Sequence, residues 1–273
     1  MSDSTNVNKI NLSGAQQTLL ITLYAKALDS RSKHSILHDK KADEIFRSLD
    51  FDVERAEGFG SKNVLVVRAK QYDEWVNEFI RSNPNAIVLN LGCGLDPRVA
   101  RIKPPPTVDW FDLDFPEVMK ERRKFFSVGG GYHMIESSMT EPGWMEKIPK
   151  NRPAIVVADG VLEYITKDEV CILFNRITDY FHSGQIVFDV MSSAAVERGR
   201  KRLKDTMGAE HKWAVDNIQN VDALDPKLKR IDAFSLFGSK YVARLPMKVR
   251  LSFWIVNLVP NFKNTIRLLR YEF

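Results

Sequence analysis

The feature that most constrains the fold is a continuous apolar run, Ala86-Ile-Val-Leu-Asn-Leu91, which stops at Gly92-Cys-Gly94. Such a run is typical of a strand that is buried on both faces. Two glycines directly after it allow a sharp turn and a close approach of the backbone to a ligand. Parallel α/β sheets bind ligands at the carboxyl ends of their strands. The sequence therefore predicts an α/β sheet with a binding turn at residues 92–94.

Further strands alternate with helices along the chain. Apolar runs predict strands at 107–113, 132–136, 154–158 and 185–190 and a closing strand at 265–271. Helical patterns are expected at 116–126 and 168–181, and residues 192–220 are charged and expected to be helical. Three more helices, at 13–29, 39–49 and 64–81, precede the first strand and predict a helical cap. This alternation favours a doubly wound, mainly parallel sheet with helices on both faces.

Acidic residues follow the second and fourth strands. Asp112 and Asp114 lie about 20 residues after the glycine turn, where a carboxylate accepts hydrogen bonds from ribose hydroxyls. The alternative is that one of them caps the helix that begins at Pro116. Asp159 and Gly160 end the fourth strand, as either ligand-edge residues or an ordinary capping turn. Because Pro97 replaces the third glycine of a dinucleotide motif, a cofactor without phosphates is favoured.

Composition narrows the partners. The net charge of +5 invites a nucleic-acid role, but the 40 Lys+Arg are interspersed with 35 Asp+Glu, as on solvated helix faces. Two cysteines, Cys93 and Cys171, indicate neither a metal cluster nor a disulfide scaffold. Residues 1–11 show no signal pattern, and the apolar run 251–260 is too short to span a bilayer. We expect a soluble cytoplasmic protein, a monomer or homodimer, with no nucleic-acid, membrane or metal partner.

Several ordered motifs together resemble the leucine carboxyl methyltransferase superfamily, and within it the branch typified by the tetracenomycin polyketide O-methyltransferase. The motifs are Leu12-Ser-Gly-Ala-Gln-Gln-Thr-Leu-Leu, Tyr24-Ala-Lys-Ala-Leu28, Arg68-Ala-Lys-Gln-Tyr-Asp73, Asn90-Leu-Gly-Cys-Gly-Leu-Asp96, Asp112-Leu-Asp-Phe-Pro-Glu-Val118, Asp159-Gly-Val-Leu-Glu-Tyr164 and the tail 259–271. The resemblance covers nearly the whole chain. It implies a Rossmann-like class I methyltransferase with S-adenosylmethionine as cofactor and S-adenosylhomocysteine as product.

The resemblance also implies one domain over residues 1–273, with an N-terminal cap (1–83), a cofactor-binding core (84–191) and an acceptor-side insertion with closing strands (192–273). It implies a set of cofactor-binding residues, each matched by its place in a motif. These are Arg68 for the cofactor carboxylate with Lys26 assisting, Gly92 at the methionyl part with Gly94 in the same turn, Asp114 with Asp112 beside it at the ribose, Ser138 and Met139 at the adenine, and Asp159, in place of the usual glutamate, near the sulfonium. An arginine suits this role because it can bind a carboxylate through two parallel contacts.

The acceptor is less constrained. Tyr164 is either an acceptor-pocket residue or a packed helix aromatic, and we expect the pocket between residues 13–50 and 192–237. A carboxylate acceptor needs no base, whereas a hydroxyl benefits from one, and none of the histidines (His34, His38, His133, His182, His211) lies in a motif. We expect O-methylation of a small molecule, with a protein C-terminal carboxylate as the alternative. A nicotinamide-dependent oxidoreductase, a nucleic-acid methyltransferase and a non-catalytic binding module are weaker alternatives.

Overall fold

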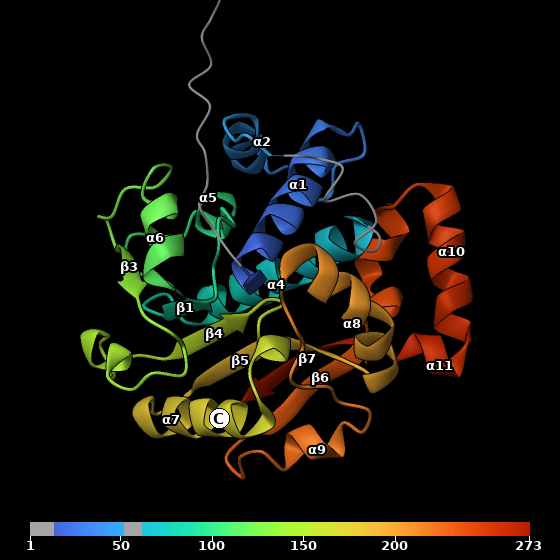
Figure 1. The fold of residues 1–273 in the computed structure, drawn as a ribbon. Helices are drawn as coiled ribbons and strands as arrows, with labels where there is room; N and C mark the ends of the chain where they lie inside the picture. The colour runs from blue at the N-terminus through green and yellow to red at the C-terminus, as the bar shows by residue number, and fades with distance from the viewer. Residues whose placement is uncertain (1–13, 52–61) are drawn as a thin grey trace, which may run out of the picture.

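A seven-stranded sheet runs through the centre of the molecule in the computed structural model, which describes residues 14–51 and 62–273 (Figure 1). The strands lie in the order β3-β2-β1-β4-β5-β7-β6. Their bounds are β1 Ile87–Leu91, β2 Asp109–Asp114, β3 Tyr132–Glu136, β4 Ala154–Ala158, β5 Gly184–Met191, β6 Lys229–Ser235 and β7 Ile266–Glu272. β1 to β5 pair in parallel, and β7 is antiparallel to both β5 and β6. This topology confirms the Rossmann-like, mainly parallel sheet.

The register of the central strands places the site. Leu91, the last residue of β1, is level with Leu113 of β2 on one side and with Ala158 of β4 on the other. β1 and β4 are buried at every position because helices cover both faces of the sheet. The turns after β1, β2 and β4 therefore meet along one edge of the sheet.

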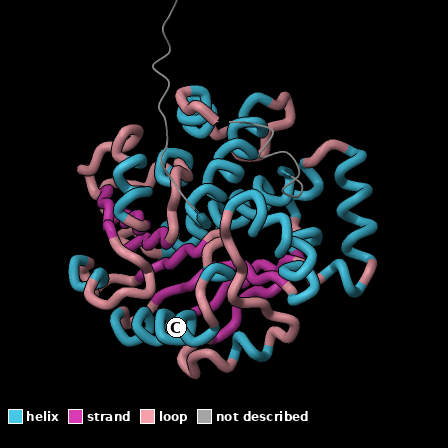
Figure 2. Tube along the Cα trace, viewed as in Figure 1, coloured by secondary structure: helices cyan, strands magenta, loops and turns pink. Residues whose placement is uncertain are grey.

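Helices surround the strands on both faces (Figure 2). The longer ones are α1 Thr18–Arg31, α2 Lys40–Arg47, α4 Lys62–Ser82, α6 Pro116–Arg122, α7 Lys167–Tyr180, α8 Ser193–Met207 and α10 Met247–Leu258. The short ones are α5 Arg98–Ile102, α9 Gln219–Asp222, α11 Pro260–Lys263 and the 3-10 turns η1 Gly14–Gln17, η2 Trp144–Lys147, η3 Leu162–Tyr164, η4 Leu236–Gly238 and η5 Lys240–Arg244.

Three apolar clusters hold these layers together. One packs α7 against one face of the sheet, and another packs α4 and Phe253 of α10 against the opposite face. The third joins α1 and α2 to Leu95, just after the glycine turn, and to Leu203 and Met207 of α8. The cap formed by α1 and α2 therefore stands over the carboxyl edge of the sheet, as Figure 1 shows.

Most predicted elements are present, with shifted ends. The strands at 132–136 and 154–158 have the predicted bounds. The helix predicted from Ser13 begins instead as the 3-10 turn η1 and becomes α-helical at Thr18, and Ser13 itself lies outside the described residues. Helix α7 begins one residue early because Thr166 and Glu169 form a reciprocal capping box. In the charged region 192–220, α8 ends at Met207, where Gly208 adopts a left-handed conformation, and helical structure resumes only at Gln219 in α9.

Two segments differ in kind from expectation. β6 carries no clear apolar alternation, and most of its side chains are exposed, so the sequence did not predict it individually. Tyr164 ends the 3-10 turn η3 and does not lie in the following helix. In the described ranges, 14–51 and 62–273, no helix has the length and apolar character needed to cross a membrane.

Candidate functional site

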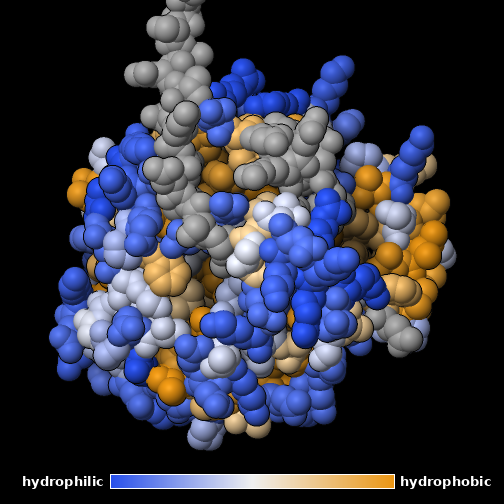
Figure 3. All heavy atoms as spheres, viewed as in Figure 1, coloured by the Kyte–Doolittle hydropathy of each residue, from blue (hydrophilic) through white to orange (hydrophobic). Residues whose placement is uncertain are grey.

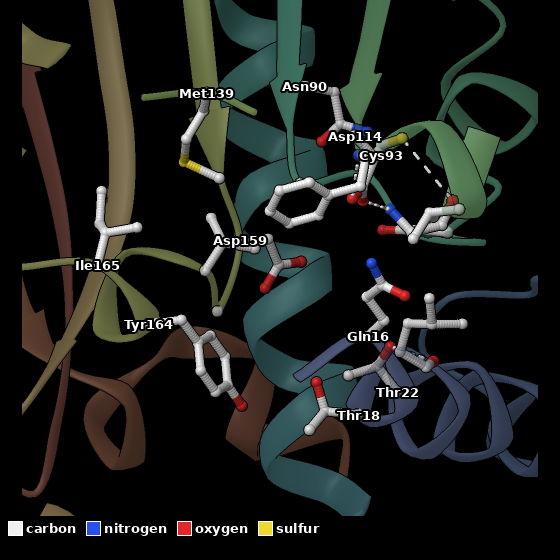
Figure 4. A pocket seen from close by; sticks show the side chains of 18 of the residues that line it. Gln16, Thr18, Thr22, Asn90, Cys93, Asp114, Met139, Asp159, Tyr164 and Ile165 are labelled. Carbon is white, nitrogen blue, oxygen red and sulfur yellow. Dashed lines mark hydrogen bonds between the residues drawn. The ribbon is translucent and has the colours of Figure 1, made fainter. Parts of the chain in front are cut away.

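A cavity of about 330 Å³ opens where the turns after β1, β2 and β4 meet (Figure 4). The sheet edge supplies Gly92, Asp114 and Asp159 to its wall, and the cap supplies Gln16 and Thr18 from η1 and α1. Its volume is in the range typical of small-molecule sites. Candidate residues from separate segments of the chain therefore line one cavity.

The glycine turn is fixed by contacts that only glycine permits. Gly92 has a φ of +59°, and a Cβ added there would lie 2.5 Å from Cγ1 of Val161. The backbone N–H of Cys93 donates to the carbonyl of Leu113 and holds the turn against β2. Cys93 itself is buried, and burial raises the pKa of its thiol well above the ordinary value. A thiol with a raised pKa is a poor nucleophile, so Cys93 acts as a small, buried packing residue.

Asp114 ends β2 and faces the cavity. Its Oδ2 accepts a hydrogen bond of 2.8 Å from the Gly94 backbone N–H, and its Oδ1 accepts one of 2.8 Å from the Phe115 N–H. Burial raises the pKa of this carboxyl to about 6, against the lowering effect of the two backbone donors. The carboxylate therefore joins the glycine turn to β2 and remains a hydrogen-bond acceptor at the cavity wall.

Asp112 does not line the cavity, so the prediction that it lies beside Asp114 at the ribose is wrong. Its side chain is fully buried, and its Oδ1 accepts from Asn90 at 2.8 Å and from the Trp110 ring N–H at 2.9 Å. Its Oδ2 accepts from the Tyr132 hydroxyl at 2.6 Å and from Arg122. Although the two acids alternate onto one strand face, only Asp114 lies at the strand end. Asp112 instead anchors the packing beneath α6.

Arg68, on α4, lines the cavity but is already paired with two aspartates. Its Nε lies 2.6 Å from Oδ1 of Asp159, and its Nη1 donates to Oδ2 of Asp189 at 2.9 Å. Asp189 also accepts hydrogen bonds from the Tyr72 hydroxyl and the Gly160 N–H. We expected Arg68 to bind a ligand carboxylate through two parallel contacts. In the structure, two of its guanidinium nitrogens instead contact protein carboxylates, one on each aspartate.

The Arg68 pair belongs to a larger buried network, which we call the charge cluster. Its members are Lys26, Arg68, Arg98, Arg101, Asp39, Asp73, Asp96, Asp159 and Asp189. Lys26 lies 2.8 Å from Asp96, and Arg98 contacts Asp159 at 2.5 Å. Burial opposes ionisation of Asp96, but Arg101, Lys26 and Arg98 outweigh it and hold the pKa of Asp96 well below the ordinary value.

Sequence reasoning named only three of the nine members, Lys26, Arg68 and Asp159, as site residues. Arg98 and Arg101 lie three residues apart on α5, directly after the glycine turn, and both side chains are almost wholly buried. Asp189 lies near the carboxyl end of β5, on the same sheet edge as the predicted acids. The available signal was the position of these charges after predicted strands, but a charge after a strand is ordinarily solvated, and only the packed cap shows that these are not.

The remaining predicted residues lie at the cavity. Ser138 and Met139, which follow β3, and Lys26 of α1 line its wall. Tyr164 lines it too, opposite Gln16, Thr18 and Thr22 in Figure 4. Lys212 reaches the cavity from the segment after α8, so the cap and the 192–237 region meet there as expected.

No histidine of the described residues supplies a base at the cavity. Within the described chain, none of the five histidines lines it. His211 contacts a residue of the cavity wall, because its ring centroid lies 5.1 Å from that of Tyr164. Burial lowers the pKa of His211, so the imidazole is neutral near pH 7. It packs behind Tyr164 and does not face the cavity.

Comparison with known proteins agrees with the family resemblance of the sequence motifs. The family model for leucine carboxyl methyltransferases matches residues 15–130. The tetracenomycin polyketide synthesis O-methyltransferase TcmP of Streptomyces glaucescens is 33% identical over 270 residues, which are 97% of this chain and 98% of that protein. The S-adenosyl-L-methionine-dependent methyltransferase dpfgK of Gibberella zeae is 29% identical over 253 residues, with 84% and 85% of the two chains covered.

The fold has a solved counterpart. The crystal structure of a proposed methyltransferase from Thermobifida fusca YX superposes with a TM-score of 0.64 over 98% of this chain and 96% of that one. The two sequences are 12% identical, so this likeness concerns the fold alone.

Proposed function

Because this chain belongs to the leucine carboxyl methyltransferase family, we propose that it methylates an oxygen atom, a carboxylate or a hydroxyl, of a small secondary metabolite. The chain is an S-adenosylmethionine-dependent methyltransferase, as its relatives are named. The proposal draws its acceptor class from TcmP, whose name specifies polyketide O-methylation. The single observation that carries it is the cavity at the sheet edge, roofed by the cap and lined by five members of the charge cluster (Lys26, Arg68, Asp96, Arg98 and Asp159).

The charge cluster suits a cationic cofactor. Five aspartates face four cationic side chains, so the cluster holds one excess negative charge when all nine groups are ionised. Glu163 lies nearby, but burial raises its pKa to about 8 and keeps it mostly uncharged at pH 7. S-adenosylmethionine supplies a methyl group on a sulfonium and carries one more positive than negative charge. Charges of opposite sign attract most strongly where water is excluded, so the cluster favours this cofactor over its product, whose thioether is neutral and whose net charge is zero.

Individual residues suit the parts of that cofactor. We assign the ribose hydroxyls to Asp114, whose carboxylate faces the cavity, and the adenine to Ser138 and Met139. Asp159 is a methylene shorter than the family's usual glutamate, and Arg68 and Arg98 hold it in place from two sides. We assign the amino-acid end of the cofactor to Arg68 and Lys26, whose aspartate partners fix their orientation.

The acceptor end of the cavity favours a small molecule. Gln16, Thr18 and Thr22 of the cap face Tyr164 across it, and Lys212 adds one positive charge. The neutral polar groups can orient a hydroxyl or a carboxylate, whereas Lys212 and Glu169 line the cavity with opposite charges and together favour neither sign of acceptor. Methyl transfer from a sulfonium needs mainly alignment, for which effective molarities are worth roughly 7–11 kcal/mol in good cases. A protein C-terminus is the alternative acceptor, because the family's name refers to leucine carboxylates.

Two measurements test the proposal. Calorimetric titration with S-adenosylmethionine and S-adenosylhomocysteine, against NADH and NADPH as controls, should show saturable binding of the sulfur nucleotides only. Transfer of labelled methyl from S-adenosylmethionine is then measured with polycyclic phenols, aromatic carboxylates and peptides ending in leucine. Alkaline treatment separates the products, because methyl esters hydrolyse and methyl ethers do not. Methylation of the peptides alone would replace the small-molecule proposal by the protein alternative.

A further inference from the structure

Helix α10 exposes an apolar face that no described part of the chain covers. Seven large apolar side chains along α10 and the following turn are exposed: Met247, Leu251, Trp254, Ile255, Leu258, Val259 and Phe262. We call this set the α10 face. Figure 3 shows apolar residues gathered on the right edge of the molecule, where Figure 1 places α10 and α11.

The periodicity of α10 explains why this face points outward. Met247, Leu251, Trp254, Ile255 and Leu258 recur at the three- and four-residue spacing of one helical face. The opposite side packs inward through Phe253, the one buried side chain of the helix, whose ring meets Phe237 with centroids 5.1 Å apart. One side of α10 therefore packs against the core, and the other side is apolar but does not contribute to the core. Patches of this kind mark interaction surfaces.

In the chain segment that carries the α10 face, the charges are all of one sign. Between Asp232 and Glu272 the sequence contains seven basic residues and no acidic one. Lys248 and Arg250 flank the apolar stripe on its two sides, and both are exposed. Arg198, on the strongly basic helix α8, lies over the ring of Phe262 at 5.1 Å. An apolar helix face bordered by Lys and Arg, with Trp, Leu and Phe at its centre, has the features of a helix that lies in a membrane interface.

We propose that the α10 face docks this protein on an anionic phospholipid membrane. The apolar side chains enter the boundary between headgroups and acyl chains, and the flanking basic residues bind the anionic headgroups. The charge pattern favours a membrane over a second copy of the chain, because a two-fold contact through α10 would set two copies of the same basic segment against each other with no acidic residue of that segment to pair with them. The inference concerns a surface outside the cavity and does not depend on the acceptor.

Intrinsic fluorescence gives a direct test in the full-length protein. Of the five tryptophans, Trp254 is 58% exposed, whereas the others are at most 8% exposed. Titration with vesicles of phosphatidylcholine containing phosphatidylglycerol should shift the Trp254 emission to the blue, and brominated acyl chains should quench it. Vesicles of phosphatidylcholine alone should bind much more weakly. The affinity for the mixed vesicles should fall as NaCl is raised from about 0.1 M to about 1 M, since salt screens the headgroup contacts.

Substitutions separate the two contributions. The double variant Lys248→Gln, Arg250→Gln should bind the anionic vesicles about 25-fold more weakly, at about fivefold for each basic residue. Leu258→Ser should weaken binding by roughly tenfold through lost apolar burial. Val128→Ser and Ile172→Ser, at exposed apolar residues away from this face, are matched controls that should bind like the parent protein. Helical circular dichroism confirms that each variant is folded.

Three results would overturn the proposal. One is the absence of any emission shift with anionic vesicles. Another is equal affinity for neutral and anionic vesicles. The third is a dimer, by light scattering, that Leu258→Ser dissociates and that high salt strengthens, which would assign the face to a second copy.

Discussion

Replacing Asp114 by asparagine separates the ribose contact from the stability of the fold. The ionised carboxylate of Asp114 faces the cavity, and a hydrogen bond to a charged group is worth about 1.5–3 kcal/mol. Its loss should therefore weaken binding of S-adenosylhomocysteine by roughly 10- to 150-fold, at about tenfold for each 1.4 kcal/mol. The assay is calorimetric titration at about pH 7.5, with parent protein and variant side by side.

The same substitution should have little effect on unfolding. The pKa of about 6 lies roughly two pH units above the ordinary carboxyl value of 3.8, and each unit is about 1.4 kcal/mol, so burying the carboxylate costs about 3 kcal/mol at pH 7. The neutral amide of Asp114→Asn would relieve this cost but could accept only one of the two backbone hydrogen bonds, from Gly94 or Phe115. These opposing effects are similar in size.

The pH dependence provides the sharpest form of this test. Since ribose hydroxyls donate to the ionised carboxylate, the parent protein should lose affinity as the pH falls through about 6, and Asp114→Asn should not. The stability contribution of the raised pKa has the opposite sign, being fully present below 3.8 and lost as the pH rises through about 6. A variant Asp114→Asn that binds with parental affinity, or that retains the same pH profile, would refute the ribose assignment.

The buried charges lead to three further predictions. Arg68→Ala leaves Asp159 without one partner, so the free energy of unfolding in urea should fall by about 3–5 kcal/mol. Binding of S-adenosylmethionine should also weaken sharply, and Arg68→Lys should be intermediate in both measurements. Parental affinity in a folded Arg68→Ala variant would exclude the proposed role. Asp112→Asn breaks the buried pair with Arg122 and should also lower the free energy of unfolding by about 3–5 kcal/mol. The folded fraction should still bind the cofactor normally. A loss of cofactor affinity without a loss of stability would contradict the structural role of Asp112. Because burial raises the pKa of Glu163 to about 8, its contribution to stability is lost as the pH rises from 4.5 to about 8. The melting temperature of Glu163→Gln should therefore rise relative to that of the parent protein across this pH range. A difference in melting temperature that does not change with pH would contradict the raised pKa.

Local patterns in the sequence were enough to predict the sheet. The run 86–91 and the run 154–158 could not be amphipathic helices of ordinary length, and the glycines at 92 and 94 marked the edge at which they end. Their order then fixed which ends meet, because parallel strands joined by crossover helices share one carboxyl edge. That rule is why residues as distant as Asp114 and Asp159 were correctly expected at one cavity. The exposed strand β6 had no such pattern.

Tertiary packing decided what those residues contact. Asp112 and Asp114 are two residues apart with identical side chains, yet one is enclosed by Arg122 and Trp110 and the other opens to the cavity. The sequence contains no sign of this difference, because it depends on which side of the strand end the neighbouring helix covers. Similarly, the residues around Leu251 form an apolar stretch in the sequence, but only the structure shows that a single side of α10 is used by the core.

The sequence by itself determined the fold class, the edge at which the cavity opens and the family, because each rests on local patterns and their order. The charge cluster was decided only by the tertiary structure. Arg98, Arg101 and Asp189 pair with acids and bases from distant segments, and their ionisation depends on the water that the cap excludes. Burial and pairing are properties of the assembled chain, so no local stretch of sequence contains them.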